Sequence, residues 1–298
     1  MVALFFVAVI AGMSYYMLSR LERDTWRTSL LVRTAQAEFY AQGSVMWAAE
    51  QLRANLKKQK PNLVVDKMPM VSPLDDFNGY KISSKITDAQ ARFNLNNLSS
   101  SEAVTDFKRL MQLLDAKYNE QKATAILNAI ADWIRQGQVK NEYSQYYMSL
   151  SPPYRAAHRA FLSASELQLV KGMTPELFSL LQPYITALPM ATKVNVQSAP
   201  AAVLASLTPD MSLETAREIE KACAKTDIVS TAAFLNLDIV KNHRVPEGKI
   251  TVLSQYFLVE TTVKIEKQQI VIYTLLERTG DAKKNAVKVV WQSKGIPG

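Results

Sequence analysis

The first eighteen residues of the chain are apolar on every side of a helix. The run MVALFFVAVIAGMSYYML, from Met1 to Leu18, contains no charged side chain. The first ionised residues come directly after it, and they are Arg20, Glu22, Arg23 and Asp24. As a helix this run would be about 27 Å long, which is close to the thickness of the hydrocarbon core of a bilayer. The pattern therefore predicts a transmembrane helix within residues 1–19.

Two other interpretations of this run fit its composition less well. A cleaved secretory signal has a cationic start and a small-residue cleavage site, and neither precedes the charges that begin at Arg20. A buried helix of a soluble protein seldom begins at the chain terminus and stays uncharged all round for five turns, as this run does. The membrane span is therefore favoured over both.

The hydrophobic pattern continues beyond the span as one face of a helix. Between Ser19 and Lys60 there is a single glycine, Gly43, and no proline. Apolar side chains recur there at steps of three, four or seven residues, and they are Leu30, Ala37, Ala41, Val45, Ala48, Leu52 and Leu56. Together the span and this amphipathic part predict one helix of about 55 residues that ends before Pro61. Such a beginning is similar to that of type IV pilins.

Beyond Pro61 the hydrophobic period changes twice. Residues 61–78 show no sustained period and predict a loop, and residues 79–98 alternate apolar and polar side chains as one or two half-buried strands do. Helices are then expected at 99–114, 123–134, 165–170, 175–181, 200–207, 213–224 and 231–235. After Gly248 the period returns to two, and strands are expected at 255–265, 269–278 and 286–292. Polar turns at Glu266-Lys267 and Gly280-Asp281 would join these strands.

This order of elements predicts an α+β fold. The long amino-terminal helix would pack on a small antiparallel sheet, in a pilin-like domain made of residues 20–98 and 251–298. A large all-α domain, residues 99–250, would be inserted between the early and the late strands.

The composition of the chain argues against several kinds of functional site. The net charge of +8 permits contact with nucleic acid or an anionic membrane, but Lys and Arg are spread from Arg20 to Lys294. The single cysteine, Cys223, excludes an intramolecular disulfide, and two histidines far apart, His158 and His243, argue against a histidine-based site. No GxSxG, Walker or HExxH motif occurs, so nothing in the sequence supports an enzyme, including a membrane-bound hydrolase.

Several blocks of the sequence resemble the type II secretion system protein K family, the large minor pseudopilins. The most specific block is DAQARFNLNNL, from Asp88 to Leu98. Others follow in the same order, and they are Asp132-Trp133-Ile134, Ser165-Glu166-Leu167, Val170-Lys171-Gly172-Met173, Leu188-Pro189 and Val194-Asn195-Val196. The resemblance implies a non-enzymatic subunit at the tip of the periplasmic pseudopilus, which initiates its assembly for protein export across the outer membrane.

The resemblance also implies partners and a location. The partners would be the minor pseudopilins I and J in a ternary tip complex, other pseudopilins and the inner-membrane secretion platform, with no cofactor and no nucleic acid. The chain would cross the inner membrane of a Gram-negative bacterium once, with its globular part in the periplasm. A short cationic leader ending in Gly would be removed by prepilin peptidase, and this sequence looks like the mature form. Leader charges would outweigh Arg20, Arg23 and Arg27, which alone would place the following part in the cytoplasm.

The candidate assembly residues are Leu4, Phe5 and Phe6, at the start of the span. In most pilins and pseudopilins the fifth mature residue is a glutamate, whose carboxylate neutralises the amino-terminal amine of a neighbouring subunit. Here that position is Phe5 or Phe6, depending on whether the mature chain starts at Met1 or Val2, and no carboxylate precedes Glu22. Proteins of the K family share this departure. We hypothesise that the subunit needs no partner above it and so begins the filament.

A membrane-tethered nucleic-acid-binding protein is the alternative function. Residues 190–224 resemble a helix-hairpin-helix module, in which a tight hairpin that contains glycine turns backbone N–H groups toward a phosphate. The hairpin here, Leu207 to Ser212, has no glycine and carries Asp210 where a phosphate would lie. A packing role for the two helices is therefore favoured.

Two further groups of residues are candidates for binding. Asp132 and Glu142 lie where some K proteins bind calcium through an acidic cluster, although the residues between them include Arg135 and Lys140 and hard cations need six or more oxygen ligands. An aromatic group could form a partner surface or pack beneath a loop, and packing is favoured. Its members are Tyr143, Tyr146, Tyr147 and Tyr154.

Overall fold

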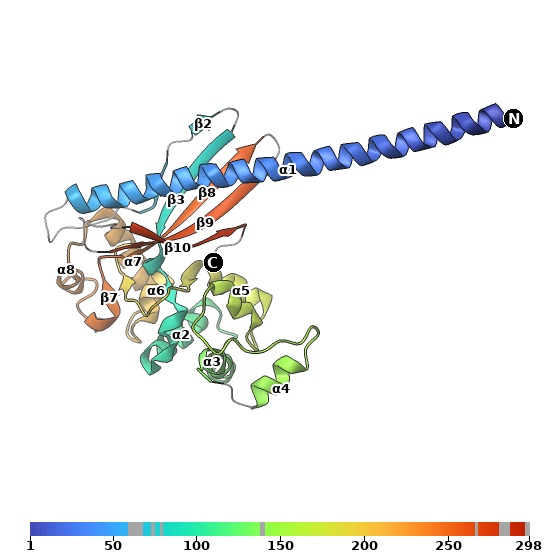
Figure 1. Cartoon of the computed structure of the whole chain (residues 1–298). Helices are drawn as coiled ribbons and strands as arrows, with labels where there is room; N and C mark the ends of the chain where they lie inside the picture. The colour runs from blue at the N-terminus through green and yellow to red at the C-terminus, as the bar shows by residue number, and fades with distance from the viewer. Residues whose placement is uncertain are drawn as a thin grey trace.

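The computed structural model describes residues 1–58, 68–72, 75–77, 80–137, 141–265, 268–279 and 287–295. Helix α1 runs without interruption from Val2 to Lys58, over 57 residues. Its amino-terminal half extends far beyond the rest of the molecule, while its second half lies along a sheet, with a helical region on the other side of that sheet (Figure 1). The expected long helix and the α+β fold are confirmed.

The described part of the sheet has six strands, all paired antiparallel, in the order β1-β3-β8-β9-β10 with β2 also paired to β3. The strands are β1 Met70–Val71, β2 Asp75–Phe77, β3 Tyr80–Asp88, β8 Tyr256–Ile265, β9 Gln268–Arg278 and β10 Val287–Lys294. Strand β3 pairs with β8 along its whole length, from Tyr80 opposite Ile265 to Asp88 opposite Phe257. The chain therefore leaves the sheet and returns to it at the same end, and the helical region is built between these two points.

The second half of α1 covers one face of this sheet. Its fully buried side chains follow the predicted stripe, and they are Ala37, Ala41, Ala48 and Leu52. Around Ala48 and Leu52 a core cluster forms with strand residues Ile86, Phe257 and Leu276. Since three of the four buried helix residues are alanines, the helix backbone can approach the sheet closely. The stripe predicted from the sequence is thus the face that joins helix to sheet.

The region between β3 and β8 is mainly helical. Its elements are η1 Ala89–Ala91, η2 Leu95–Ser99, α2 Ser101–Leu114, α3 Glu120–Ile134, α4 Glu142–Met148, η3 Ala164–Leu169, α5 Pro175–Leu181, η4 Gln182–Tyr184, α6 Ala201–Ser206, α7 Leu213–Lys225, α8 Thr231–Leu235 and η5 Glu247–Lys249. Side chains just before the helices begin accept hydrogen bonds from their first turns, as Ser100 does at α2 and Thr174 at α5. The apolar faces of these helices form two core clusters, one around Phe107 and one around Val203.

The sequence prediction is wrong in three details. The supposed loop at 61–78 contains β1 and β2, and the supposed all-α region contains two-residue strands. They are β5 Ile185–Thr186, which pairs in parallel with β4 Phe93–Asn94 just before that region, and β6 Val194–Asn195, which pairs with β7 Ile250–Thr251 at its end. Helix α4 was not expected either. Strands of two or three residues are too short to show a period, and the three tyrosines in α4 have low helix propensity. The turns expected at 266–267 and 280–281 lie outside the described residues.

One buried carboxylate joins the sheet to the helical region. Asp88 ends β3, and its Oδ2 accepts hydrogen bonds from Asn195 Nδ2 at 2.7 Å, Ser198 Oγ at 2.6 Å and Ser254 Oγ at 2.7 Å. Its Oδ1 accepts from the backbone N–H of Gln90 at 2.8 Å. Burial raises the pKa of this carboxyl, while its hydrogen bonds lower it. The end of β3, the segment 195–198 and the start of β8 are thereby held at one point.

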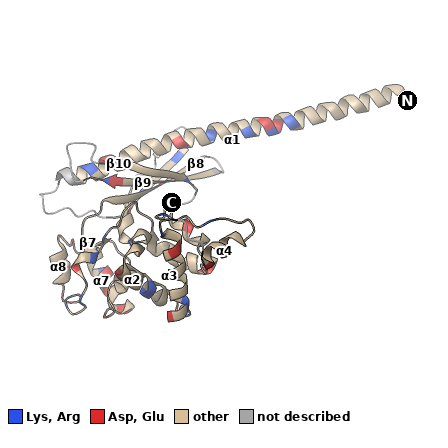
Figure 2. Cartoon of the chain, turned by 60° about the horizontal axis from the view of Figure 1, so that its bottom comes forward, with Lys and Arg blue, Asp and Glu red and all other residues tan. Residues whose placement is uncertain are grey.

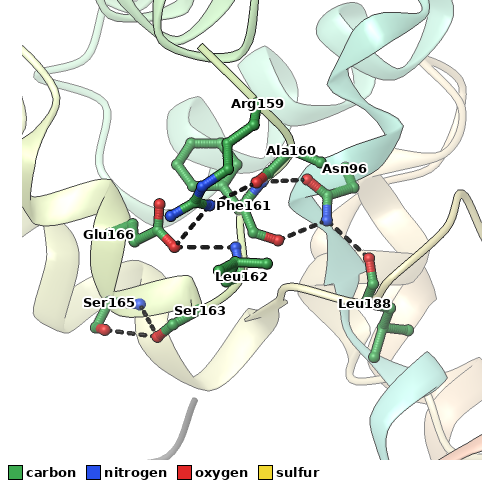
Figure 3. A network of polar contacts seen from close by, with 9 residues as sticks. All are labelled: Asn96, Arg159, Ala160, Phe161, Leu162, Ser163, Ser165, Glu166 and Leu188. Atoms are coloured by element: carbon green, nitrogen blue, oxygen red, sulfur yellow. Dashed lines mark hydrogen bonds and ion pairs between the residues drawn. The ribbon is translucent and has the colours of Figure 1, made fainter. Parts of the chain in front are cut away.

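Amide side chains of the DAQARFNLNNL block also hold the sheet and the helical region together. Asn96 Nδ2 donates to the carbonyl oxygens of Phe161 at 2.9 Å and Leu188 at 2.7 Å, and Asn96 Oδ1 accepts from the N–H of Phe161 at 2.8 Å (Figure 3). Asn97 Nδ2 likewise donates to the carbonyl of Thr192 at 2.8 Å, and Gln90 Nε2 to that of Lys193 at 3.1 Å. The polar residues of DAQARFNLNNL therefore hold loops of the helical region in place.

We expect Asp88→Asn to lower the free energy of unfolding by about 2–4 kcal/mol, because the amide turns an NH₂ group toward partners that already donate. Urea unfolding of the full chain in detergent micelles measures this change. Asp210→Asn is the matched control, since Asp210 is exposed, and it should change stability by less than about 0.5 kcal/mol. Equal stability of the two variants would contradict the role assigned to Asp88.

Candidate membrane anchor and assembly site

The first turns of α1 present apolar side chains to all sides. Every residue from Met1 to Leu18 is exposed, including the candidate assembly residues Leu4, Phe5 and Phe6. In the described part of the chain, α1 is the one helix long and apolar enough to cross a membrane, and none of its most apolar window is buried. Figure 2 shows that the charged side chains of α1 begin only beyond this segment. Because such a surface is unfavourable in water, it is a candidate membrane anchor.

The second half of α1 also carries exposed apolar side chains, on the face turned away from the sheet. Val32, Phe39 and Met46 are spaced by seven residues, and Phe39 and Met46 are 77% and 74% exposed. Residues at this spacing share one face of a helix, which lies opposite Ala37, Ala41 and Ala48. We call Val32, Phe39 and Met46 the outer stripe. Its seven-residue spacing is visible in the sequence, but the periodic apolar positions from Leu30 to Leu56 predicted only the opposite, buried face.

A groove of about 600 Å³ lies where α1 leaves the sheet. Its lining includes Leu21, Thr25 and Val32 of α1 and Tyr80 of β3. The hydroxyl of Tyr80 donates a hydrogen bond to Gln36 Oε1, which fixes one wall of the groove. The groove meets the outer stripe at Val32, so both belong to one surface that continues from the membrane span.

The hairpin of the helix-hairpin-helix-like part is engaged inside the molecule. Thr208 Oγ1 donates to the carbonyl oxygen of His243 at 3.0 Å, and His243 Nδ1 lies 2.8 Å from the carbonyl oxygen of Asp210. All residues of α6 are buried. In Figure 2, basic and acidic side chains are interspersed over the helical region. These features favour packing over phosphate binding for residues 190–224.

The two calcium candidates differ in their surroundings. Asp132 is 1% exposed and accepts a hydrogen bond from Asn141 Nδ2, whereas Glu142 is exposed in the first turn of α4. Within the described residues no three His, Cys, Asp or Glu side chains gather as a metal site would require. Residues 138–140, between the two candidates, lie outside the described part. Calcium binding by Asp132 and Glu142 stays an untested prediction.

The tyrosines of the aromatic group pack on one another and on Trp133. Tyr147 is 0% exposed, and its ring lies 5.5 Å from that of Trp133 and 5.4 Å from those of Tyr146 and Tyr154. The Tyr147 hydroxyl accepts a hydrogen bond from the N–H of Lys171 at 3.1 Å. Burial raises the pKa of Tyr147 to about 12. Tyr147 is therefore part of the core, and Tyr143, Tyr146 and Tyr154 pack against that core half-buried, which favours a packing role for the group.

Comparison with known proteins identifies the family. The family model for type II secretion system protein K matches residues 91–190, beginning within the DAQARFNLNNL block. The type II secretion system protein K of Pseudomonas aeruginosa is 30% identical over 289 residues, which cover 88% of this chain and 82% of the relative. The chain belongs to the type II secretion system protein K family. The protein K of Klebsiella pneumoniae is 29% identical over 300 residues, covering 94% of this chain and 91% of its own length.

A solved structure of this system shares the fold. A chain of the GspK-GspI-GspJ complex from the type 2 secretion system of enterotoxigenic Escherichia coli matches with a TM-score of 0.74 and 22% identity, over 91% of this chain and 99% of its own. The family resemblance drawn from the sequence blocks is confirmed. Membership of the protein K family makes the chain a minor pseudopilin of the type II secretion system, with a structural and not an enzymatic role.

The buried position of Tyr147 predicts a loss of stability in alkali. Its pKa is higher in the folded chain than the ordinary value of about 10, so between about pH 10 and 12 the unfolded chain loses its proton first and stability falls. The full loss is about 2.7 kcal/mol for two pKa units. Urea unfolding in micelles at pH 9 and above pH 11 measures it. Tyr147→Phe should reduce this pH dependence by that amount, and an unchanged dependence would contradict the assignment.

Proposed function

We propose that this chain begins the pseudopilus at its tip, in a complex with the minor pseudopilins I and J. The observation that carries the proposal is the division of α1 into an exposed apolar half and a half fixed to the sheet. The solved complex with the same fold, which contains GspI and GspJ beside GspK, supports the choice of partners. In this proposal the apolar half crosses the inner membrane once and the sheet and helical region lie in the periplasm.

The outer stripe is the proposed contact with the helices of I and J. All three subunits would insert their amino-terminal helices into one membrane, so the helices would run side by side as they leave it. Val32, Phe39 and Met46 then continue the apolar surface of the span along the face of α1 that the sheet leaves open. Burying such side chains against neighbouring helices is favourable by about 1.5–3 kcal/mol each.

The helical region is the proposed cap of the fibre. Residues 99–250 lie on the sheet face that α1 leaves free (Figure 1). They make the subunit wider on the side away from α1. A subunit of this shape would be too wide to be stacked within a fibre of small pilin-like domains, and it would fit best at the end. We propose the domain division at residues 98 and 250 on the same grounds.

Assembly with I and J tests the proposal directly. The full chain, co-expressed with I and J and purified in detergent by a tag on this chain, should retain both. Phe39→Glu should weaken retention at least about tenfold, because it places a charge in an apolar helix contact. Thr105→Glu, which adds the same charge on the exposed face of α2, should leave retention unchanged. Failure of the unmodified chain to retain I and J would overturn the proposal.

The absence of a carboxylate near the start of α1 generates a second prediction. Phe5→Glu and Phe6→Glu introduce a carboxylate into the span, which costs about 2.5–3.5 kcal/mol unless a neighbouring amine pairs with it. We expect these variants to reduce secretion and to lose their preference for the tip, whereas Phe5→Leu should behave as the unmodified chain. Secretion assays and subunit-specific labelling of sheared fibres measure both effects. Unchanged secretion and tip position would mean that the missing carboxylate is incidental.

A further inference from the structure

A cavity of about 110 Å³ lies between the sheet and the helical region, away from α1. Its floor comes from the sheet and its walls come from the segment after β3 and from η3 and η4. The lining residues that matter here are Arg92, Gln168, Gln182, Leu258, Leu275 and Trp291. Asp88 borders this space, and the outer stripe lies away from it.

The positively charged residue in the lining of this cavity is Arg92, which begins the RFNLNNL part of the DAQARFNLNNL block. Its guanidinium makes no hydrogen bond or ion pair with the residues that the structure describes, although a guanidinium offers five N–H donors in a planar fork. Burial lowers the pKa of Arg92, and the charge of Glu260 on β8 raises it. The lining therefore holds a half-buried guanidinium whose N–H donors are not bonded to any residue that the structure describes.

A second free donor lies in the same lining. The indole Nε1 of Trp291 is buried and finds no acceptor within the described part of the chain. An indole N–H can only donate, and an unsatisfied buried donor costs about 1–3 kcal/mol. Arg92 and Trp291 are 199 positions apart in the sequence, and both line this cavity.

No other lining group bonds the Arg92 guanidinium or the Trp291 indole within the described part of the chain. Asp88 also lines the cavity, but both of its oxygens are already occupied by the hydrogen bonds described above. Gln168 and Gln182 carry amides, each of which can turn either an N–H₂ donor or an acceptor oxygen inward. Leu258 and Leu275 leave the floor apolar. The cavity thus combines one positive charge, several donors and an apolar floor.

We propose that this cavity binds a carboxylate that carries a short aliphatic group. The two oxygens of a carboxylate match the fork of Arg92 and leave lone pairs for the Trp291 indole, while the aliphatic part fits on Leu258 and Leu275. A phosphate dianion fits less well, because Arg92 is the sole cation among the described lining residues and Asp88 and Glu260 lie close by. The carboxylate belongs either to a free small acid or to an acidic side chain or terminus of a polypeptide.

The indole resonance of Trp291 reports on the cavity directly. The full chain, labelled with ¹⁵N-tryptophan in detergent micelles, gives four indole signals, and Trp291→Phe identifies the one that belongs to Trp291. Titration with sodium propionate at constant ionic strength should shift this signal saturably, with a Kd on the order of 1 mM for so small a ligand. The signals of Trp26, Trp47 and Trp133 should not move. Propionamide, which has the same shape without the charge, should cause no saturable shift.

Variants of the walls link the shift to Arg92. Arg92→Gln should raise the Kd for propionate more than about tenfold, and Arg92→Lys, which keeps the charge and loses the fork, should raise it less. Gln182→Leu removes a neutral donor without touching the charge and should weaken binding a few-fold. It keeps the test valid if Arg92→Gln does not fold, which the other three indole signals would reveal.

Peptides then separate the two sources of the carboxylate. A short peptide ending in a free carboxylate that binds at least about tenfold tighter than propionate, and tighter than its amidated form, identifies a polypeptide ligand. Binding no tighter than propionate identifies a free small acid. The proposal is overturned if propionate causes no saturable shift of the Trp291 signal, if propionamide shifts it equally, or if the wall variants leave the Kd unchanged.

Discussion

The fold depends on one buried carboxylate at the point where the chain leaves its sheet. Strands β3 and β8 are antiparallel neighbours, so the whole helical region must begin and end at the same end of this strand pair. Asp88 binds the end of β3 to Asn195, Ser198 and Ser254 through three hydrogen bonds, and accepts a fourth from the N–H of Gln90. A carboxylate in such a place is tolerable only when donors surround it, which means that the segments supplying them must stay in register. The orientation of the helical region relative to α1 follows from that requirement.

Most of the fold could be predicted because its elements are long or well marked. The alanine-rich stripe predicted the buried face of α1, and the helices expected to begin at residues 99 and 175 begin at Ser101 and Pro175. Strands β5, β6 and β7, and the pairing of β4 with β5, could not be predicted, because two residues carry no periodic signal and their partners are distant in the chain. The DAQARFNLNNL block identified the family before its physical role was apparent.

The candidate surfaces were harder to predict for a different reason. Periodicity shows which side chains are buried within one chain, and Phe39 and Met46 are buried only if another subunit covers them. The groove at Tyr80 and the cavity at Arg92 and Trp291 are formed by residues far apart in sequence, so their formation depends on the tertiary arrangement and not on a local pattern. The apolar span, in contrast, could be predicted from its composition alone.

The continuity of α1 has a mechanical consequence. About 36 residues precede the first contact with the core at Ala37, which amounts to about 54 Å of helix without a proline. Membrane helices tilt by about 20° on average, and a tilt of that size would carry the sheet and helical region sideways by about 18 Å. The helix is thus a lever arm, and small changes of angle inside the bilayer would become large displacements of the subunit's far end.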